Sequence, residues 1–155
     1  MKTFAELVRD LQGAVQEVFP WDVEESISSG ATPIILDVRE ESEFAAMHIA
    51  DSLNVPRGIL ETACEYNYEE TVKELVEARE RDIVIVCRSG NRSVLAAYTM
   101  QLLGYTRVSS MKTGLRGWND YELQLVNTDG KAVSVEQADE FFTTRLRPEQ
   151  IKPAK

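Results

Sequence analysis

Four consecutive β-branched residues, Ile83 to Val86, run directly into a short polar loop that begins with a cysteine. An uninterrupted β-branched run of this length is typical of a buried strand. The residues from Val94 to Leu103 are helix formers with apolar side chains at helical spacing, so the loop opens onto a helix. This strand–loop–helix unit places Cys87 at the carboxyl end of a strand, where open α/β sheets bind their ligands.

The loop after Cys87 has features that stabilise a sulfur anion. Backbone N–H groups at the start of the following helix, with the positive end of the helix dipole behind them, favour a thiolate over a thiol. Arg88 and Arg92 add positive charge nearby. An unreactive cysteine buried at a strand end is the alternative, but burial explains neither these arginines nor Gly90. We therefore expect Cys87 to be a nucleophile.

The length of the loop separates two chemistries. Cysteine-dependent phosphatases and arsenate reductases place a histidine before the cysteine and five residues between the cysteine and the arginine, because a tetrahedral oxyanion needs a wide ring of donors. In this chain Val86 precedes Cys87, and only four residues lie between Cys87 and Arg92. The tighter loop favours a sulfur atom or a persulfide, which leaves phosphatase or arsenate reductase chemistry as the weaker alternative.

The histidine content argues against a third chemistry. A cysteine protease or acyltransferase needs a histidine base beside the nucleophile. The single histidine, His48, belongs to a separate motif. A thiolate that is stabilised by loop amides and arginines needs no base, so the lack of a second histidine counts against acyl transfer but not against sulfur transfer.

Four separated motifs resemble, in the same order, those of the rhodanese-like sulfurtransferase family. They are Leu36 to Glu40 followed by Glu43-Phe44 and His48-Ile49; Asn54 to Pro56; Cys87 to Ser93; and Gly114 to Trp118. The first and third are specific in combination. The resemblance extends from about Phe19 to Leu125.

The resemblance implies that Cys87 takes up a sulfane sulfur, becomes a persulfide and passes the sulfur to a thiophilic acceptor in a ping-pong cycle. The residues that it implies for substrate binding are Arg39, Arg88, Ser89, Gly90, Asn91, Arg92 and Ser93. Arg39 and Arg88 match arginines associated with an anionic donor such as thiosulfate. Ser89 stands where larger thiosulfate enzymes place a lysine, so a protein persulfide or a small persulfide is an alternative physiological donor. No metal or other cofactor is implied.

The order of the expected elements predicts an α/β three-layer fold, with a mostly parallel central sheet and helices on both faces. This is also the rhodanese-like fold that the resemblance implies. We expect an N-terminal segment, 1–17, with an amphipathic helix over 3–16; a catalytic domain, 18–126; and a C-terminal helical extension and tail, 127–155. The expected strands are 18–19, 34–38, 52–55, 83–86 and 107–109, and the expected helices are 22–29, 40–47, 69–81, 94–103 and 135–146.

Composition narrows the partners and the compartment. With 155 residues, 43% of them apolar and 28% charged, the chain fits one globular catalytic domain. The net charge of −9 disfavours nucleic acid as a partner, and no apolar stretch is long enough for a membrane span or a signal peptide. Two cysteines form neither a disulfide framework nor a metal cluster, so we expect a cytoplasmic protein.

The expected partners are a small-molecule sulfur donor and acceptor, with a sulfur-carrier protein as a further candidate and either a monomer or a homodimer as the assembly. A rival interpretation is a rhodanese-like binding or regulatory module without turnover. The intact Cys87 and both loop arginines disfavour it, since a binding module needs no nucleophile.

Five other residues have alternative roles. His48 is expected to be a structural hydrogen-bonding residue and not a proton carrier. Asp37 and Glu43 are expected to fix Arg39 and the turn around it, with a pair of carboxylates for acid–base chemistry as the alternative. Trp118 fits either the pocket mouth or the core. Cys64 is expected to be a loop thiol without function, with resolution of a Cys87 persulfide as the alternative.

Overall fold

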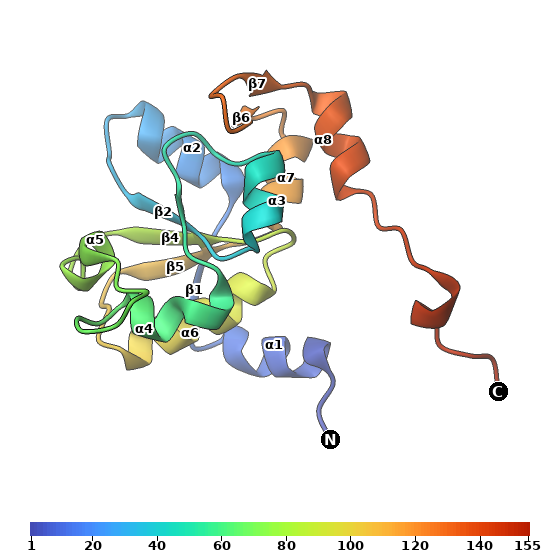
Figure 1. The fold of residues 1–155 in the computed structure, drawn as a ribbon, viewed down its shortest axis with the longest axis horizontal. Coiled ribbons are helices and arrows are strands. Elements are labelled where there is room, and N and C mark those ends of the chain that lie inside the picture. Colours follow the sequence, from blue (N-terminus) through green and yellow to red (C-terminus); the bar gives the residue numbers. More distant parts are fainter.

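The computed structural model describes residues 1–155, and at its centre lies a five-stranded sheet (Figure 1). The strand order is β1 (Gln16–Val18), β5 (Val108–Met111), β4 (Ile83–Val86), β2 (Ile34–Asp37) and β3 (Leu53–Asn54). All neighbouring strands are parallel, so their carboxyl ends meet at one edge of the sheet. β4 lies in the middle of this order, which puts Cys87 at the centre of that edge.

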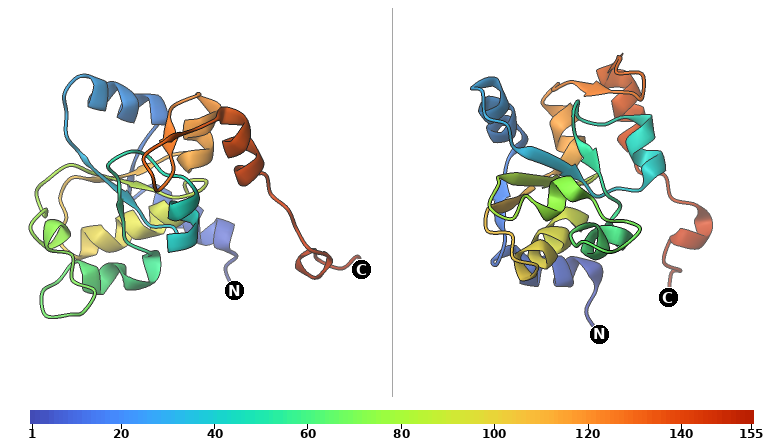
Figure 2. Two further views of the ribbon diagram at one scale, coloured as in Figure 1. Left: turned by 45° about the horizontal axis from the view of Figure 1, so that its top comes forward. Right: turned by 60° about the vertical axis from the view of Figure 1, so that its left-hand side comes forward.

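Helices cover both faces of the sheet, and the side chains of β4 alternate between the two layers. Ile83 and Ile85 belong to one core, whereas Val84 and Val86 belong to the other. The first core is covered by α1 (Phe4–Gln12), α4 (Leu60–Ala63), α5 (Lys73–Val76) and α6 (Arg92–Leu102), and the second by α2 (Pro20–Ser28), α7 (Gly114–Asp120) and α8 (Val135–Phe142). The predicted three-layer α/β fold is therefore confirmed (Figure 2).

The remaining elements are short. They are α3 (Glu41–Ala46), the 3₁₀ turns η1 (Arg57–Ile59) and η2 (Pro148–Gln150), and the antiparallel pair β6 (Leu125–Val126) and β7 (Ala132–Val133). The longest helix, α6, has 11 residues, and none of the helices is long and apolar enough to cross a bilayer.

The predicted charged helix over 69–81 is wrong, because only the turn α5 is helical there. Tertiary contacts of Arg79 override the helical pattern. Its guanidinium donates to the backbone carbonyls of Cys64 at 2.7 Å and Leu103 at 2.9 Å, and to the Tyr105 hydroxyl at 2.7 Å. The backbone leaves the helix after Val76 and delivers Arg79 to these acceptors.

Helix boundaries near the termini also differ from expectation. The N-terminal helix stops at Gln12, which frees Gln16–Val18 to form the edge strand β1. The next helix begins at Pro20 and not at Asp22, since the Asp22 carboxylate accepts the Phe19 N–H at 3.0 Å from inside the first turn. Proline is well suited to the first position of a helix. A backbone N–H at this position would have no partner within the helix, so its absence in proline loses no hydrogen bond.

The C-terminal extension packs on the domain through α8 and then leaves it. Ala138 and Phe142 are buried in the second core beside Trp118 of α7. The helix ends at Phe142, four residues earlier than expected. Residues 143–155 are exposed and run away from the body (Figures 1 and 2). Residues 135–142 of the extension therefore belong to the packed body of the domain.

The start of α7 holds the loop that follows β4. Leu115 donates its N–H to the carbonyl of Cys87 at 2.8 Å, and Arg116 donates to the carbonyl of Arg88 at 3.0 Å. Gly114 has φ +61°, and a Cβ at this position would lie 2.5 Å from the Cys87 carbonyl oxygen. Only glycine allows α7 to approach the loop so closely.

We predict that Gly114→Ala destabilises the protein by about 3 kcal/mol or more, because the added methyl group meets backbone atoms at an already unfavourable φ. Gly130→Ala is the matched control. Gly130 also has a positive φ, of +74°, but no atom lies within 4 Å of its Cβ position, so we expect a loss of about 1–2 kcal/mol. Urea unfolding measures both values, and equal losses would contradict the steric argument.

Candidate functional site

The sulfur of Cys87 is surrounded by hydrogen-bond donors of its own loop. The N–H of Gly90 lies 3.2 Å from Sγ and that of Ser93 lies 3.4 Å from it. The Ser93 hydroxyl is also 3.4 Å from Sγ and is linked to the Ser110 hydroxyl at 2.7 Å. Cys87 is only 1% exposed. These N–H groups are placed to interact with a negative charge on the sulfur.

Gly90 lets the loop turn its N–H toward the sulfur. Its φ is +89°, a conformation that other residues adopt only with strain. A Cβ on Gly90 would also lie 2.9 Å from the backbone nitrogen of Thr113 and 3.2 Å from the carbonyl oxygen of Met111. The loop is therefore packed against the segment that leads into α7, and its curvature is fixed by tertiary contact.

Arg92, at the start of α6, forms a bidentate ion pair with Glu43 of α3. Its two terminal nitrogens each donate to a carboxylate oxygen at 2.9 Å. These hydrogen bonds hold the pKa of Glu43 below its ordinary value, against the opposing effect of burial, and they raise the pKa of Arg92. Glu43 forms no hydrogen bond with Arg39, but its carboxylate accepts the Glu40 N–H at 3.3 Å, so Glu43 fixes the turn after Arg39 as expected and also holds the loop arginine.

Arg39 lies in the protein interior and not at the pocket. Its guanidinium is 0% exposed and binds Asp37 in a bidentate manner, through Nε to Oδ1 at 3.0 Å and Nη2 to Oδ2 at 2.8 Å. Nη2 also donates to the carbonyl of Met47 at 2.7 Å, while Nη1 has no hydrogen-bond partner. Asp37 fixes Arg39 as expected. Arg39 does not line the pocket over Cys87, and its role toward a donor stays a prediction.

Arg88 is held by the C-terminal extension. Its Nη2 donates to the carbonyl of Phe142 at 2.6 Å and to the hydroxyl of Thr144 at 3.2 Å. The end of α8 therefore sets the direction in which Arg88 leaves the loop. The local sequence contains no signal for this contact, because the partners lie more than fifty positions away.

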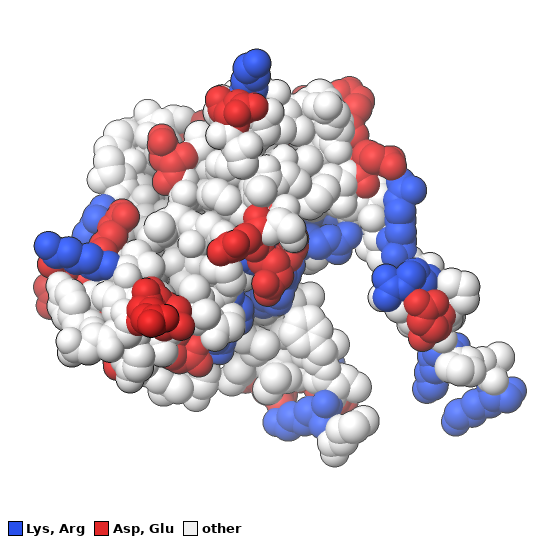
Figure 3. Space-filling view, viewed as in Figure 1, with Lys and Arg blue, Asp and Glu red and all other residues white.

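The loop residues come together around a small open pocket of about 160 Å³. Its lining consists of Phe4, Cys87, Arg88, Ser89, Asn91 and Arg92. The loop lies at the right-hand end of the sheet in Figure 1, facing the hollow that Figure 3 shows between the body and the C-terminal tail. Gly90 and Ser93 lie beneath the pocket and bind the sulfur. Phe4 was missed by sequence reasoning, since it fits the apolar side of an ordinary amphipathic helix.

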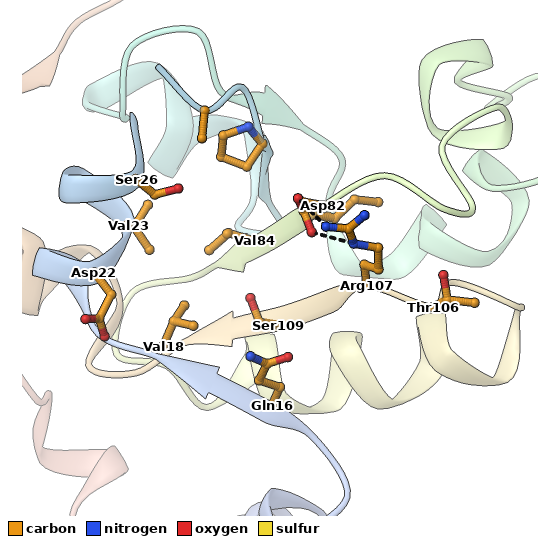
Figure 4. A pocket seen from close by; sticks show the side chains of 13 residues that line it. Gln16, Val18, Asp22, Val23, Ser26, Asp82, Val84, Thr106, Arg107 and Ser109 are labelled. Atoms are coloured by element: carbon orange, nitrogen blue, oxygen red, sulfur yellow. Dashed lines mark hydrogen bonds and ion pairs between the residues drawn. The ribbon is translucent and has the colours of Figure 1, made fainter. Parts of the chain in front are cut away.

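A larger cleft of about 500 Å³ lies elsewhere (Figure 4). Val23 and Ser26 of α2 face Val84 and Ser109 of the sheet across it, and an ion pair between Asp82 and Arg107 stands at its border. The two cavities share no lining residue, and the larger one contains no cysteine or histidine. Chemistry, and not size, therefore identifies the smaller pocket as the candidate site.

Three other candidate residues, His48, Trp118 and Cys64, have contacts that are typical of structural residues. The Nδ1 atom of His48 lies 2.8 Å from the carbonyl oxygen of Phe44, and the imidazole ring stacks on the Phe44 ring, as expected for a structural histidine. Trp118 is buried in the core and donates to the carbonyl of Gln124 at 3.0 Å. Cys64 is fully buried at the end of α4 and not exposed in a loop, and burial raises the pKa of its thiol.

No group of three or more His, Cys, Asp or Glu side chains is placed to hold a metal ion.

The fold and the loop together define a class: an α/β domain with a cysteine-containing loop at the carboxyl edge of a parallel sheet. Residues 20–121 match the family described as "Rhodanese-like domain". The chain belongs to this family. The helices α1 and α8 and the strand β1 lie outside the residues that match it.

Relatives with assigned names point to sulfur chemistry. A "Sulfurtransferase" of Allochromatium vinosum is 29% identical over 117 residues, covering 75% of this chain and 99% of the relative. The "Putative sulfur carrier protein YrkF" of Bacillus subtilis is 35% identical over 95 residues, covering 61% of this chain and 45% of the relative. A "Putative thiosulfate sulfurtransferase, mitochondrial" of Schizosaccharomyces pombe is 33% identical over 90 residues, covering 56% of this chain and 63% of the relative. The chain thus spans less than two thirds of the last two relatives.

Solved structures agree on the fold. Protein RPA3614 of Rhodopseudomonas palustris, described as "Possible Tyrosine Phosphatase", superposes with a TM-score of 0.70 at 25% identity, covering 79% of this chain and 92% of that one. A thiosulfate sulfurtransferase of Pseudomonas aeruginosa gives a TM-score of 0.65 at 21% identity, over 90% of this chain and 25% of that one.

We predict that the Glu43–Arg92 pair makes stability depend on pH. The folded pKa of Glu43 lies below its ordinary value of 4.5, so the pair contributes fully above that pH, and the contribution of about 1 kcal/mol is lost as the pH falls through the folded pKa. In urea unfolding between about pH 6 and about pH 3, Glu43→Gln should therefore lose stability less steeply than the native protein. Glu61→Gln, in the more exposed pair with Arg57, is the control and should keep the native slope.

We also predict that iodoacetamide modifies Cys87 and spares Cys64 at neutral pH. Cys87 lines an open pocket and receives two backbone N–H groups, whereas Cys64 does not line this pocket and burial raises the pKa of its thiol. Peptide mass mapping of the native protein, Cys64→Ser and Cys87→Ser gives the site of labelling. Preferential labelling of Cys64 would contradict this assignment.

Proposed function

We propose that this chain is a sulfurtransferase that carries a sulfane sulfur as a persulfide on Cys87. The observation that supports this most directly is the set of donors around Sγ. Two backbone N–H groups donate to it, at 3.2 Å and 3.4 Å, and the Ser93 hydroxyl lies 3.4 Å from it. Such fixed dipoles stabilise a negative sulfur before and after transfer, without reorganisation.

The reaction has two half-reactions. In the first, the Cys87 thiolate attacks the outer sulfur of the donor, the donor's S–S bond breaks, and the leaving group departs with the electron pair. With thiosulfate the leaving group is sulfite. In the second, an acceptor such as cyanide or a thiolate takes the outer sulfur of the persulfide and restores the Cys87 thiolate. Electrons and atoms balance without any external oxidant or reductant.

The charges at the mouth decide which donors suit the site. Arg92 shares its charge with Glu43, and Arg88 is partly engaged by the end of α8. Arg39 is buried, and Ser89 supplies no cation. This arrangement offers limited compensation for a dianion that approaches an anionic thiolate. We therefore propose thiosulfate as a donor in vitro and a singly charged persulfide, small or protein-borne, as the physiological donor.

The resemblance to a relative named as a sulfur carrier protein supports the proposal that a carrier protein exchanges sulfur with Cys87. A reducing, cytoplasmic compartment suits the free thiols at positions 64 and 87. Both of these finer assignments remain proposals about this chain.

Phosphatase chemistry is the second candidate, because a neighbouring fold is described in those terms. Hydrolysis of a chromogenic phosphate ester tests it. The short loop, with only four residues between Cys87 and Arg92, predicts no turnover above the Cys87→Ser background.

Intact-protein mass spectrometry tests the sulfurtransferase proposal. After incubation with thiosulfate or with a small persulfide, the native protein and Cys64→Ser should each gain one sulfur atom, which cyanide then removes as thiocyanate. Cys87→Ser should gain none, because the attacking sulfur is missing. Gain by Cys87→Ser, or no gain by the native protein with either donor, refutes the proposal and favours a binding module.

A further inference from the structure

Phe4 is the only aromatic side chain that lines the pocket over Cys87. It belongs to α1, which precedes the residues that match the family, 20–121. The other lining residues all come from the loop and the start of α6. The N-terminal helix therefore adds an apolar wall to a mouth that is otherwise polar and cationic.

The position of Phe4 is fixed by the cap at the start of the helix and by a buried residue one turn later. Thr3 caps the first turn by accepting the Glu6 N–H at 3.2 Å, while the Glu6 carboxylate accepts the Thr3 N–H at 2.7 Å. One turn after Phe4, Val8 is 4% exposed and belongs to the core shared with α6. Phe4 is held at the mouth by this capping box and this buried anchor.

Phe4 is 53% exposed, so much of its ring faces solvent beside the pocket. A pocket of about 160 Å³ has the volume of about five water molecules, enough for a small ion such as thiosulfate. A donor with a larger organic group must extend beyond the pocket, toward its border. Phe4 can then cover that group and gain apolar contact that a purely inorganic donor cannot offer.

We propose that Phe4 determines donor specificity and favours sulfane-sulfur donors that carry an apolar, preferably aromatic, group. The inference rests on the proposed sulfur transfer through Cys87. Its chemistry is that of the first half-reaction. With an organic thiosulfonate, the Cys87 thiolate takes the outer sulfur, the bond to the sulfonyl sulfur breaks, and a sulfinate leaves with the electron pair.

Benzenethiosulfonate and methanethiosulfonate form a matched pair of probes, since both carry one negative charge and the same reacting group. The native protein should show a kcat/KM about threefold to tenfold higher for the aromatic donor, as expected for one favourable ring–ring contact. Phe4→Ala should bring the two donors to within about twofold of each other. It should do so by lowering the value for the aromatic donor more than the value for the methyl donor.

Two further variants separate a ring contact from an effect on the helix. Leu7→Ala alters a partly exposed residue of the same helix that does not line the pocket, and it should keep the native preference. Phe4→Tyr keeps the ring and should also keep the preference. Thermal unfolding followed by circular dichroism checks that α1 remains folded in each variant.

The outcomes distinguish this inference from the function on which it rests. Turnover of both donors by the native protein without a preference, or a preference that survives in Phe4→Ala, overturns the role of Phe4 alone. An equal loss for both donors in Phe4→Ala assigns Phe4 to the packing of α1 and also overturns it. No persulfide from either donor in the native protein refutes sulfur transfer, and the role of Phe4 with it.

Discussion

The contact between the start of α7 and the loop after β4 is the constraint on which the site depends. Two N–H groups of α7 bind the carbonyls of Cys87 and Arg88, so these carbonyls point away from the sulfur. The loop is then free to direct the N–H groups of Gly90 and Ser93 toward Sγ. Gly114 makes this contact possible because any side chain there would overlap the loop backbone. The glycine of the Gly114 to Trp118 motif therefore acts on the catalytic loop through packing.

The arginines near the site mainly fix the local structure and contribute less to the electrostatic attraction of an anion. Each of the three has a protein partner: Asp37 for Arg39, Glu43 for Arg92, and the end of α8 for Arg88. Ion pairs of this kind fix the geometry of the loop, but they reduce the field available to an incoming anion. The main stabilisation of a sulfur anion then comes from backbone dipoles, which are present whatever substrate arrives.

Segments outside the family match shape the mouth of the site. The N-terminal helix contributes Phe4, and the C-terminal extension holds Arg88 through Phe142 and Thr144. The family core supplies Cys87 and the N–H groups around its sulfur, whereas the added segments supply part of the border of the pocket. We therefore expect proteins that share this core to differ in substrate because of such segments, since loops and additions carry specificity on a shared scaffold.

The sequence by itself determined the strand, the loop, the position of Cys87 and the layered α/β fold. These follow from local signals: the run Ile83 to Val86, the helical spacing after Gly90, and the loop spacing to Arg92. The tertiary structure alone decided the partners of the arginines, the place of Phe4 and the loss of the helix expected at 69–81. Arg92 and Glu43 are 49 positions apart, and Arg88 and Phe142 are 54 apart. Long charged side chains take whichever partner the packing brings near, and no local pattern records that choice.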